Sequence, residues 1–166
     1  LEEVYGGKKL NFVKKWKIRT FNPNLHAVYL LRMFQYYANK KGKINHYISK
    51  MYNKQLNEKY GIYIRKTTVL GKGLKMPHPS SIVFGEWTIL GENNWVYQNV
   101  TFGNKNKNGM LENQQPKTME NCIFYAGSCI IGNIVIGKNT VIGANSIISC
   151  NTENNSIYVG YNKKVK

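Results

Sequence analysis

Residues 118–151 have the sequence TMENCIFYAGSCIIGNIVIGKNTVIGANSIISCN, and this stretch decides the fold. After an initial Thr, an apolar residue recurs at every sixth position, and a Gly or Asn follows each of these positions by three. Gly and Asn accept a positive φ at low cost, as a tight corner requires. Each hexapeptide therefore predicts one strand and one corner, and three predict one triangular coil of about 18 residues. The recurring positions are Thr118, Phe124, Ile130, Ile136, Ile142 and Ile148, and the corners are Asn121, Gly127, Asn133, Asn139, Asn145 and Asn151.

The same period extends toward the N-terminus. Alternating hairpins would instead give a period of two, with no fixed count between turns. We therefore predict a mainly β fold, a parallel β-helix of hexapeptide repeats over residues 62–166. Residues 104–117 are polar, contain glycine and interrupt the period, so they predict a loop that protrudes from the coil. The earlier inward positions are Ile64, Leu70 and Met76 and, after a two-residue insertion, Phe84, Leu90, Val96 and Phe102, with corners at Gly73, Asn93 and Asn99.

Residues 1–61 lack this period and predict a small, basic, mostly helical cap. Asn22 is a predicted N-cap with Pro23 at the first helical position, and Gly42 is the predicted stop of this helix. Residues 44–60 predict a second helix. The apolar face of that helix is predicted to hold Ile44, Ile48, Tyr52 and Leu56.

Charge is unevenly distributed along the chain. Lys and Arg outnumber the acids by 24 to 8, and residues 1–75 hold +14 of the net +16. The excess fits either simple solubility or an anionic partner, such as a phosphate-bearing cofactor, an acidic glycan or an anionic membrane face. Residues 8–19 mix basic residues with apolar and aromatic ones, and we expect this segment to lie on an anionic membrane.

The remaining composition narrows the setting and the chemistry. Cys122, Cys129 and Cys150 are odd in number and lack metal-ligand spacing, which fits reduced thiols in a cytoplasm. No apolar run approaches the roughly 18 residues of a membrane span, and no signal peptide pattern is present. We expect a cytoplasmic protein, peripheral at the inner membrane face if residues 8–19 bind lipid. No nucleic-acid partner is expected, because the lysines are not interleaved with aromatics on a recognisable reader fold.

Residues 74–103, LKMPHPSSIVFGEWTILGENNWVYQNVTFG, resemble the serine O-acetyltransferases and the related capsule-polysaccharide O-acetyltransferases. In that group a histidine precedes a Gly-Ile-Val-type run, a Gly-Glu pair and a Gln-x-Val-Thr-x-Gly segment. Residues 122–148, CIFYAGSCIIGNIVIGKNTVIGANSII, resemble its coenzyme A-side coils, and the ending VGYNKKVK resembles its closing segment more loosely. The resemblance implies a left-handed β-helix, acetyl-CoA along the later coils, no metal, and a homotrimer with active sites between neighbouring subunits.

His78 occupies the position of the general base in this group. A base must take the proton of the acceptor hydroxyl as its oxygen attacks the thioester. The chain contains no aspartate to orient the imidazole. We therefore expect a backbone carbonyl, Glu86, Tyr63 or a neighbouring subunit to orient His78.

Three departures from the serine enzymes bear on the acceptor. Where those enzymes have an acid before the histidine, this chain has Pro77, and where they have an aspartate ahead of the first coil it has Tyr63. Their Arg-His pair after the loop is replaced by Gln114 and Gln115. Because these groups suited an amino acid's charges, we predict a sugar or polysaccharide hydroxyl as the acceptor.

The resemblance also assigns further candidate residues. Candidates for substrate binding or base orientation are Tyr63, Glu86, Gln98 and Gln115. Ammonium groups suit the nucleotide phosphates of coenzyme A, and small residues allow its pantetheine to approach the backbone. The resulting cofactor-binding candidates are Ala126, Gly127, Lys138, Ala144, Lys163 and Lys164.

The predicted function is an acetyl-CoA-dependent O-acetyltransferase acting on a sugar or polysaccharide hydroxyl by direct transfer, without a covalent enzyme intermediate. The alternatives are a serine O-acetyltransferase of cysteine biosynthesis and a non-catalytic basic binding protein. A metal-dependent hydratase on the same scaffold would need three histidine ligands, and only His78 lies in the coil.

Overall fold

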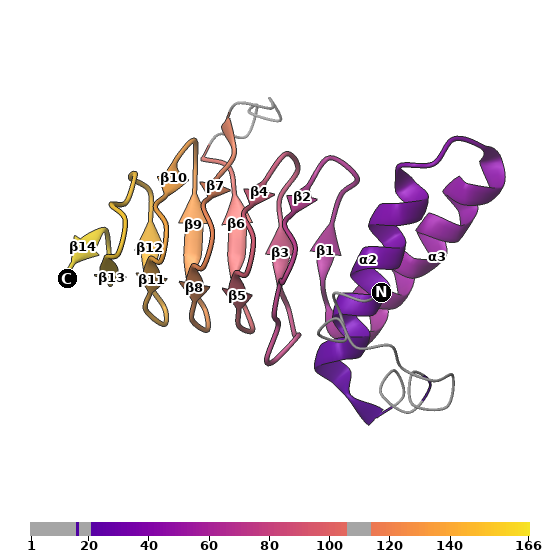
Figure 1. Cartoon of the computed structure of the whole chain (residues 1–166), viewed down its shortest axis with the longest axis horizontal. Coiled ribbons are helices and arrows are strands. Elements are labelled where there is room, and N and C mark those ends of the chain that lie inside the picture. The colour runs from indigo at the N-terminus through magenta and orange to yellow at the C-terminus, as the bar shows by residue number, and fades with distance from the viewer. Residues whose placement is uncertain (1–15, 17–20, 106–113) are drawn as a thin grey trace.

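A computed structural model describes residue 16 and residues 21–105 and 114–166 of the chain. The cap consists of the helices α2 (Pro23–Ala38) and α3 (Lys43–Tyr60), which pack against each other as an antiparallel pair beside the first coil (Figure 1). As predicted, Asn22 caps α2, and its Oδ1 accepts a hydrogen bond from the Leu25 N–H at 3.1 Å. Gly42 is not the stop of α2, which ends four residues earlier. It is the N-cap residue of α3, where a φ of 109° requires glycine.

The two cap helices are buried unequally. Along α2, Ala27, Leu30, Leu31 and Phe34 are buried, whereas the only apolar side chain of α3 in that class is Leu56. The predicted apolar face of α3 is therefore wrong at Ile44, which is 76% exposed. A helix with one packed neighbour buries only the side that faces it, and Ile44 lies far from Leu56 around the helix.

After the two helices, the described strands form a triangular coil with three sheets (Figure 1). Every strand pair is parallel except β13–β14. The first sheet contains β1 (Tyr63–Ile64), β3 (Val83–Phe84), β6 (Thr101–Gly103), β9 (Cys129–Ile131) and β12 (Ile147–Ile148). The second contains β2 (Val69–Leu70), β4 (Ile89–Leu90), β7 (Lys117–Thr118) and β10 (Val135–Ile136). The third contains β5 (Trp95–Val96), β8 (Ile123–Phe124), β11 (Val141–Ile142), β13 (Ile157–Val159) and β14 (Lys163–Lys164).

The inward positions predicted from the six-residue period are all buried, from Ile64 to Ile148. Their side chains stack from coil to coil, as in the parallel ring pair Phe84–Phe102, whose centroids lie 5.7 Å apart. The predicted fold class, a left-handed β-helix with a small helical cap, is confirmed. Stacking is what stabilises a solenoid, because each coil buries its apolar residues only against its neighbours.

Most predicted corners have the expected conformation. Positive φ values occur at seven of the nine Gly or Asn corner positions named from the sequence, including Asn121, Asn139 and Asn145. Asn133 and Asn151 are the exceptions. At the first of these corners Gly132 takes the positive φ of 99° instead, and Asn151 uses its side-chain oxygen to accept a hydrogen bond from the Val135 N–H at 2.8 Å.

Both ends of the coil are closed. At the cap end, the Arg32 guanidinium donates hydrogen bonds to the carbonyl oxygens of Leu70, at 2.7 Å, and Gly71. These bonds satisfy backbone groups that have no earlier coil to pair with. At the other end, β14 turns back and pairs antiparallel with β13. The cap thus does for the first coil what each later coil does for its predecessor.

Candidate active site

Two corners of the triangular coil carry most of the candidate residues. The His78 corner joins the third sheet to the first and comprises residues 78–81, 97–99, 125–127 and 143–145. The loop corner joins the first sheet to the second and comprises residues 65–68, 85–88, 104–116 and 132–134, of which 106–113 lie outside the described residues. The two corners lie at opposite ends of strands such as β3.

His78 is exposed in a turn that the backbone holds. The Ser80 N–H donates a hydrogen bond to the His78 carbonyl at 2.8 Å, and Pro79 between them is buried. The imidazole lies beside the Tyr97 ring, with centroids 6.0 Å apart, and Tyr97 in turn lies 5.1 Å from the Tyr125 ring. No described residue hydrogen-bonds either ring nitrogen of His78, so none of the described backbone carbonyls fills the predicted orienting role.

Four more candidates lie on the same corner, one coil above another. The Gly127 N–H donates to the Gln98 carbonyl at 3.0 Å, and the Asn145 N–H donates to the Ala126 carbonyl at 2.9 Å. Gly127 has a φ of 72°, and a Cβ there would collide with the side chain of Asn145. Gln98, Ala126, Gly127 and Ala144 thus form an edge along the coil, and three of these four residues carry a methyl group or no side chain.

Gln98 contributes a polar atom to this edge. Its Oε1 is buried and has no hydrogen-bond partner among the described residues. A buried carbonyl oxygen without a donor costs roughly 1–3 kcal/mol. An amide N–H of a ligand lying along the edge would satisfy it. The residues present on this corner thus fit a pantetheine chain, which carries amide groups.

The three lysine candidates differ in their surroundings. Lys138 lies at the corner between the second and third sheets and contacts Glu120 at 2.7 Å, a hydrogen bond that lowers the pKa of Glu120. Lys164 contacts Glu153 at 2.6 Å, which raises the pKa of Lys164. Lys163 forms no ion pair with a described residue. A carboxylate cancels much of the charge that a lysine offers to phosphate, so Lys163 is the strongest of the three.

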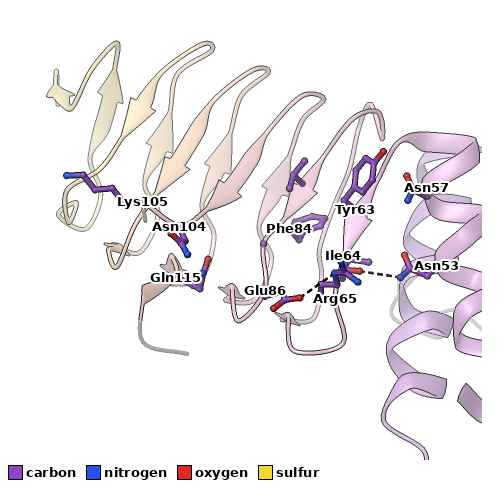
Figure 2. A pocket seen from close by; sticks show the side chains of 12 residues that line it. Asn53, Asn57, Tyr63, Ile64, Arg65, Phe84, Glu86, Asn104, Lys105 and Gln115 are labelled. Carbon is purple, nitrogen blue, oxygen red and sulfur yellow. Dashed lines mark hydrogen bonds and ion pairs between the residues drawn. The ribbon is translucent and has the colours of Figure 1, made fainter. Parts of the chain in front are cut away.

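The loop corner holds a pocket of about 710 Å³ (Figure 2). Tyr63, Glu86 and Gln115, three of the predicted substrate-binding candidates, all line it. Arg65 forms an ion pair with Glu86 at 3.4 Å between Nε and Oε1. A dashed line joins the two side chains in Figure 2. The other polar lining residues are Asn53 and Asn57 of α3 and Asn104 and Lys105 at the base of the loop.

The structure separates His78 from this pocket. His78 precedes β3 and Glu86 follows it, so one chain presents the base and the pocket on different corners of the coil. Neither Glu86 nor Tyr63 orients the imidazole of the same chain.

Sequence analysis missed several lining residues. Arg65 directly follows the inward Ile64, and Tyr97 and Tyr125 directly follow the inward Val96 and Phe124. The position after each inward residue is where a corner begins, so scanning that position would have identified all three. Asn53 and Asn57 carry no such signal, because the packing of α3 against β1 brings them to the pocket.

Other chemistries find little support among the described residues. Burial raises the pKa of the Cys122 thiol to about 11, so it holds almost no thiolate near neutral pH. In the parts of the chain that the structure describes, no three His, Cys or Glu side chains gather to form a potential metal site.

Comparisons with known proteins find similar sequences and similar folds among serine acetyltransferases. The serine acetyltransferase of Staphylococcus epidermidis is 32% identical over 124 residues, which are 74% of this chain and 55% of that protein. The serine acetyltransferase of Escherichia coli is 30% identical over 84 residues, 51% of this chain and 30% of that protein. A crystal structure of Neisseria gonorrhoeae serine acetyltransferase superposes with a TM-score of 0.75 at 28% identity, covering 86% of this chain and 55% of that one.

This chain is similar to serine acetyltransferases in sequence and in fold. A truncated serine acetyltransferase apoenzyme gives a TM-score of 0.78 at 25% identity and covers 90% of this chain and 61% of the other. No protein-family model matches the sequence. The aligned residues of this chain span only about half the length of the S. epidermidis protein.

Proposed function

We propose that this protein is an acetyl-CoA-dependent O-acetyltransferase in which His78 is the general base. The observation that carries the proposal is the exposed His78 at the start of an edge lined by small residues, on a coil whose relatives are serine acetyltransferases. One solved serine acetyltransferase, similar to this chain with a TM-score of 0.73 at 25% identity, is a complex with CoA. The non-catalytic alternative has no comparable support.

The proposed reaction is one displacement at the thioester carbonyl. Acetyl-CoA supplies the electrophilic carbonyl carbon. The His78 imidazole accepts the proton of the acceptor hydroxyl while its oxygen forms the new C–O bond, and then returns that proton to the departing thiolate as the C–S bond breaks. Histidine suits both steps because it can accept and release a proton near neutral pH. This direct transfer forms no acyl-enzyme and needs only the base and the two substrates.

The edge of the His78 corner is the proposed binding place of acetyl-CoA. Gln98 Oε1 would accept a hydrogen bond from a pantetheine amide, and Ala126, Gly127 and Ala144 would let the chain lie close to the backbone. Lys163 would contact a phosphate. Lys138 and Lys164 would do so only after exchanging their carboxylate partners.

L-serine is the acceptor that the comparisons favour. The sequence-based preference for a sugar hydroxyl is not supported by them, because the similar proteins named above are serine acetyltransferases. The pocket offers a physical reason as well. Arg65 and Glu86 supply a guanidinium for the carboxylate and a carboxylate for the ammonium group of an amino acid. The sequence-based argument against serine rested on Pro77, Tyr63, Gln114 and Gln115, and Arg65 supplies a positive charge that it did not include.

A sugar hydroxyl is the second candidate acceptor, and one observation favours it. Arg65 and Glu86 already pair with each other, and much of the remaining polar lining consists of the amides Asn53, Asn57, Asn104 and Gln115. Amide groups donate and accept hydrogen bonds and match hydroxyls without requiring a charge.

We further propose a homotrimer with a composite site. Because His78 and the pocket lie on different corners of one chain, a cyclic assembly would place the His78 corner of one subunit beside the loop corner of the next. A heterologous interface that closes into a ring repeats such a contact three times in a trimer.

Two experiments test this function. In the first, purified protein is supplied with acetyl-CoA and either L-serine or a panel of free and polymeric sugars, and thiol release is measured. Turnover with L-serine supports the first acceptor, turnover with sugars alone supports the second, and no release of free thiol with any acceptor contradicts the enzyme.

The second experiment tests the composite site. His78→Ala and Glu86→Gln proteins, each inactive alone, are unfolded, mixed and refolded together. Random assembly would regenerate about a quarter of the sites with both residues intact, if each site combines two subunits. Failure to recover activity, while each variant alone still forms trimers, would place both residues in one chain's site.

A further inference from the structure

The outward side of α3 carries a stripe that the described fold leaves uncovered. We call it the α3 face and define it by Lys43, Ile44, Tyr47, Lys50, Met51 and Lys54. Its apolar members are separated by three and four residues, which aligns them along one side of a helix. Ile44 is 76% exposed, Tyr47 67% and Met51 48%. The buried Ser49 and Leu56 lie on the opposite side, against α2 and the coil.

Such a stripe differs from scattered surface hydrophobics. Single exposed apolar side chains are ordinary, whereas a row of them on one helix is typical of a contact surface. None of the described elements covers these three side chains. The partner must therefore accept apolar groups.

Charge indicates what kind of partner fits. Lys43, Lys50 and Lys54 border the stripe, and all three are exposed. Residues 21–61 contain seven basic side chains and one acidic one, Glu58, a net charge of +6. Glu58 is itself paired with Lys54 at 3.6 Å, so Lys43 and Lys50, which form no ion pair with a described residue, supply most of the charge that this face offers to a partner. A second copy of this face would bring like charges together, which disfavours self-association through it.

An anionic lipid surface can bind both the apolar stripe and the lysines of the α3 face. Apolar side chains of an interfacial helix enter the boundary between headgroups and acyl chains, and flanking lysines reach the lipid phosphates. A nucleic acid would satisfy the lysines but leave the apolar stripe in water. None of the described helices is long and apolar enough to cross a bilayer.

We propose that the α3 face docks the protein on an anionic membrane, with α3 lying along the bilayer surface. This inference does not depend on the proposed reaction. It also differs from the expectation for residues 8–19, of which the structure describes only Trp16. The position of α3 adds a consequence. Asn53 and Asn57, on another side of the same helix, line the loop-corner pocket, so docking would hold that pocket about one helix diameter, roughly 10–12 Å, from the bilayer.

Vesicle co-sedimentation of the full chain tests the proposal. Vesicles of phosphatidylcholine with roughly a third phosphatidylglycerol are compared with pure phosphatidylcholine at low and high salt. We expect binding to the anionic vesicles only, weakening as salt rises. The variant Ile44→Ser/Tyr47→Ser/Met51→Ser should bind at least about tenfold more weakly without any change in charge. The variant Lys43→Gln/Lys50→Gln/Lys54→Gln should lose about 100-fold.

A matched control separates the face from bulk charge. The variant Lys72→Gln/Lys163→Gln/Lys166→Gln also removes three positive charges, but from exposed positions of the coil. It should bind the anionic vesicles within about threefold of the parent. Equal losses in the two lysine variants would show that net charge alone drives binding, which contradicts the proposal.

Three further results would overturn it. They are no binding to anionic vesicles at low salt, full binding by the serine variant, and a smaller oligomer for the serine variant in light scattering, since the last would make the α3 face a protein interface. Circular dichroism checks the fold. If the triple variant does not fold, the single Tyr47→Ser substitution carries the same test, with an expected loss of about threefold or more.

Discussion

The coil and the cap bury their apolar residues in different ways. In the coil, every predicted inward position from Ile64 to Ile148 is buried, because each coil is covered by the next one. In the cap, α3 packs on one side and exposes Ile44, Tyr47 and Met51 on the other. Charge is also uneven between the two regions, with 13 basic and 3 acidic residues in positions 1–61 and 11 and 5 in positions 62–166. The coil thus buries its apolar residues against its own neighbouring turns, whereas the cap retains an exposed apolar surface suited to a partner.

The largest expected difference between the two regions is catalytic. His78→Ala in the coil should lower kcat by about 10²–10⁴-fold and leave the KM for acetyl-CoA nearly unchanged, because the variant loses a proton acceptor and no cofactor contact. His46→Ala, an exposed histidine of α3, is the matched control and should keep full activity. Steady-state thiol release measures both. A His78→Ala enzyme with more than about half the parent rate would remove His78 from the mechanism.

The second-largest expected difference between the coil and the cap is in the effect of a substitution on the free energy of unfolding. Phe124→Ala in the centre of the coil should lower the free energy of unfolding by about 3–5 kcal/mol, since it leaves a cavity between stacked coils. Ile44→Ala on the α3 face should change it by no more than about 0.5 kcal/mol. Urea denaturation followed by circular dichroism gives both values. A large loss at Ile44 would mean that this side chain is buried in the protein's assembled form.

The buried thiol of the coil predicts a dependence on alkaline pH. Burial raises the pKa of Cys122 from 9.0 to about 11, so the folded state retains a proton that the unfolded state releases. The contribution is fully present below pH 9 and is lost as pH rises from 9 to 11, by at most about 3 kcal/mol. Cys122→Ala should flatten this part of the curve. Unfolding curves at several pH values compare the two proteins, and identical slopes between pH 9 and 11 would contradict the shift.

The smallest effect concerns the corners. Asn139 has a φ of 55°, and its side chain joins a ladder, donating to Asn155 Oδ1 at 2.7 Å and accepting from Asn121 at 3.1 Å. Asn139→Ala should cost about 1–2 kcal/mol, because alanine disfavours this conformation. Asn139→Gly should cost less, since it loses only the ladder. In the cap, Gly61→Ala at the C-cap of α3 should cost about 1 kcal/mol for the same backbone reason. Thermal unfolding orders the three variants, and an Asn139→Gly protein less stable than Asn139→Ala would contradict this account.

Much of the fold could be predicted because its signals are local and repeated. The six-residue period identified the inward positions, and Asn22 and Pro23 identified the start of α2. The sequence-based predictions were wrong where an adjacent residue or element determined the local backbone conformation. Gly42 begins α3 because the connection between the helices is tight, and Asn133 lacks a positive φ because Gly132 already turns that corner.

The candidate site was predictable only in part. Motif spacing singled out Tyr63, Glu86 and Gln115, which do line one pocket, but it did not reveal Arg65, which pairs with Glu86. It also offered Glu86 and Tyr63 as residues that orient His78, whereas Glu86 lies beyond the far end of β3 and no hydrogen bond joins Tyr63 to the imidazole within the described residues. Residues 20 to 50 positions apart in the sequence meet at a corner only after the coil has closed.

The sequence by itself determined the coil, its inward residues and the location of a single histidine in it, because a repeated hexapeptide imposes the same strand and corner each time. Tertiary structure decided which side chains share a corner, which lysines are already neutralised by Glu120 and Glu153, and which side of α3 stays exposed. These outcomes depend on how coils stack and on how few neighbours a two-helix cap has. That information is carried by long-range packing and not by any local pattern of residues.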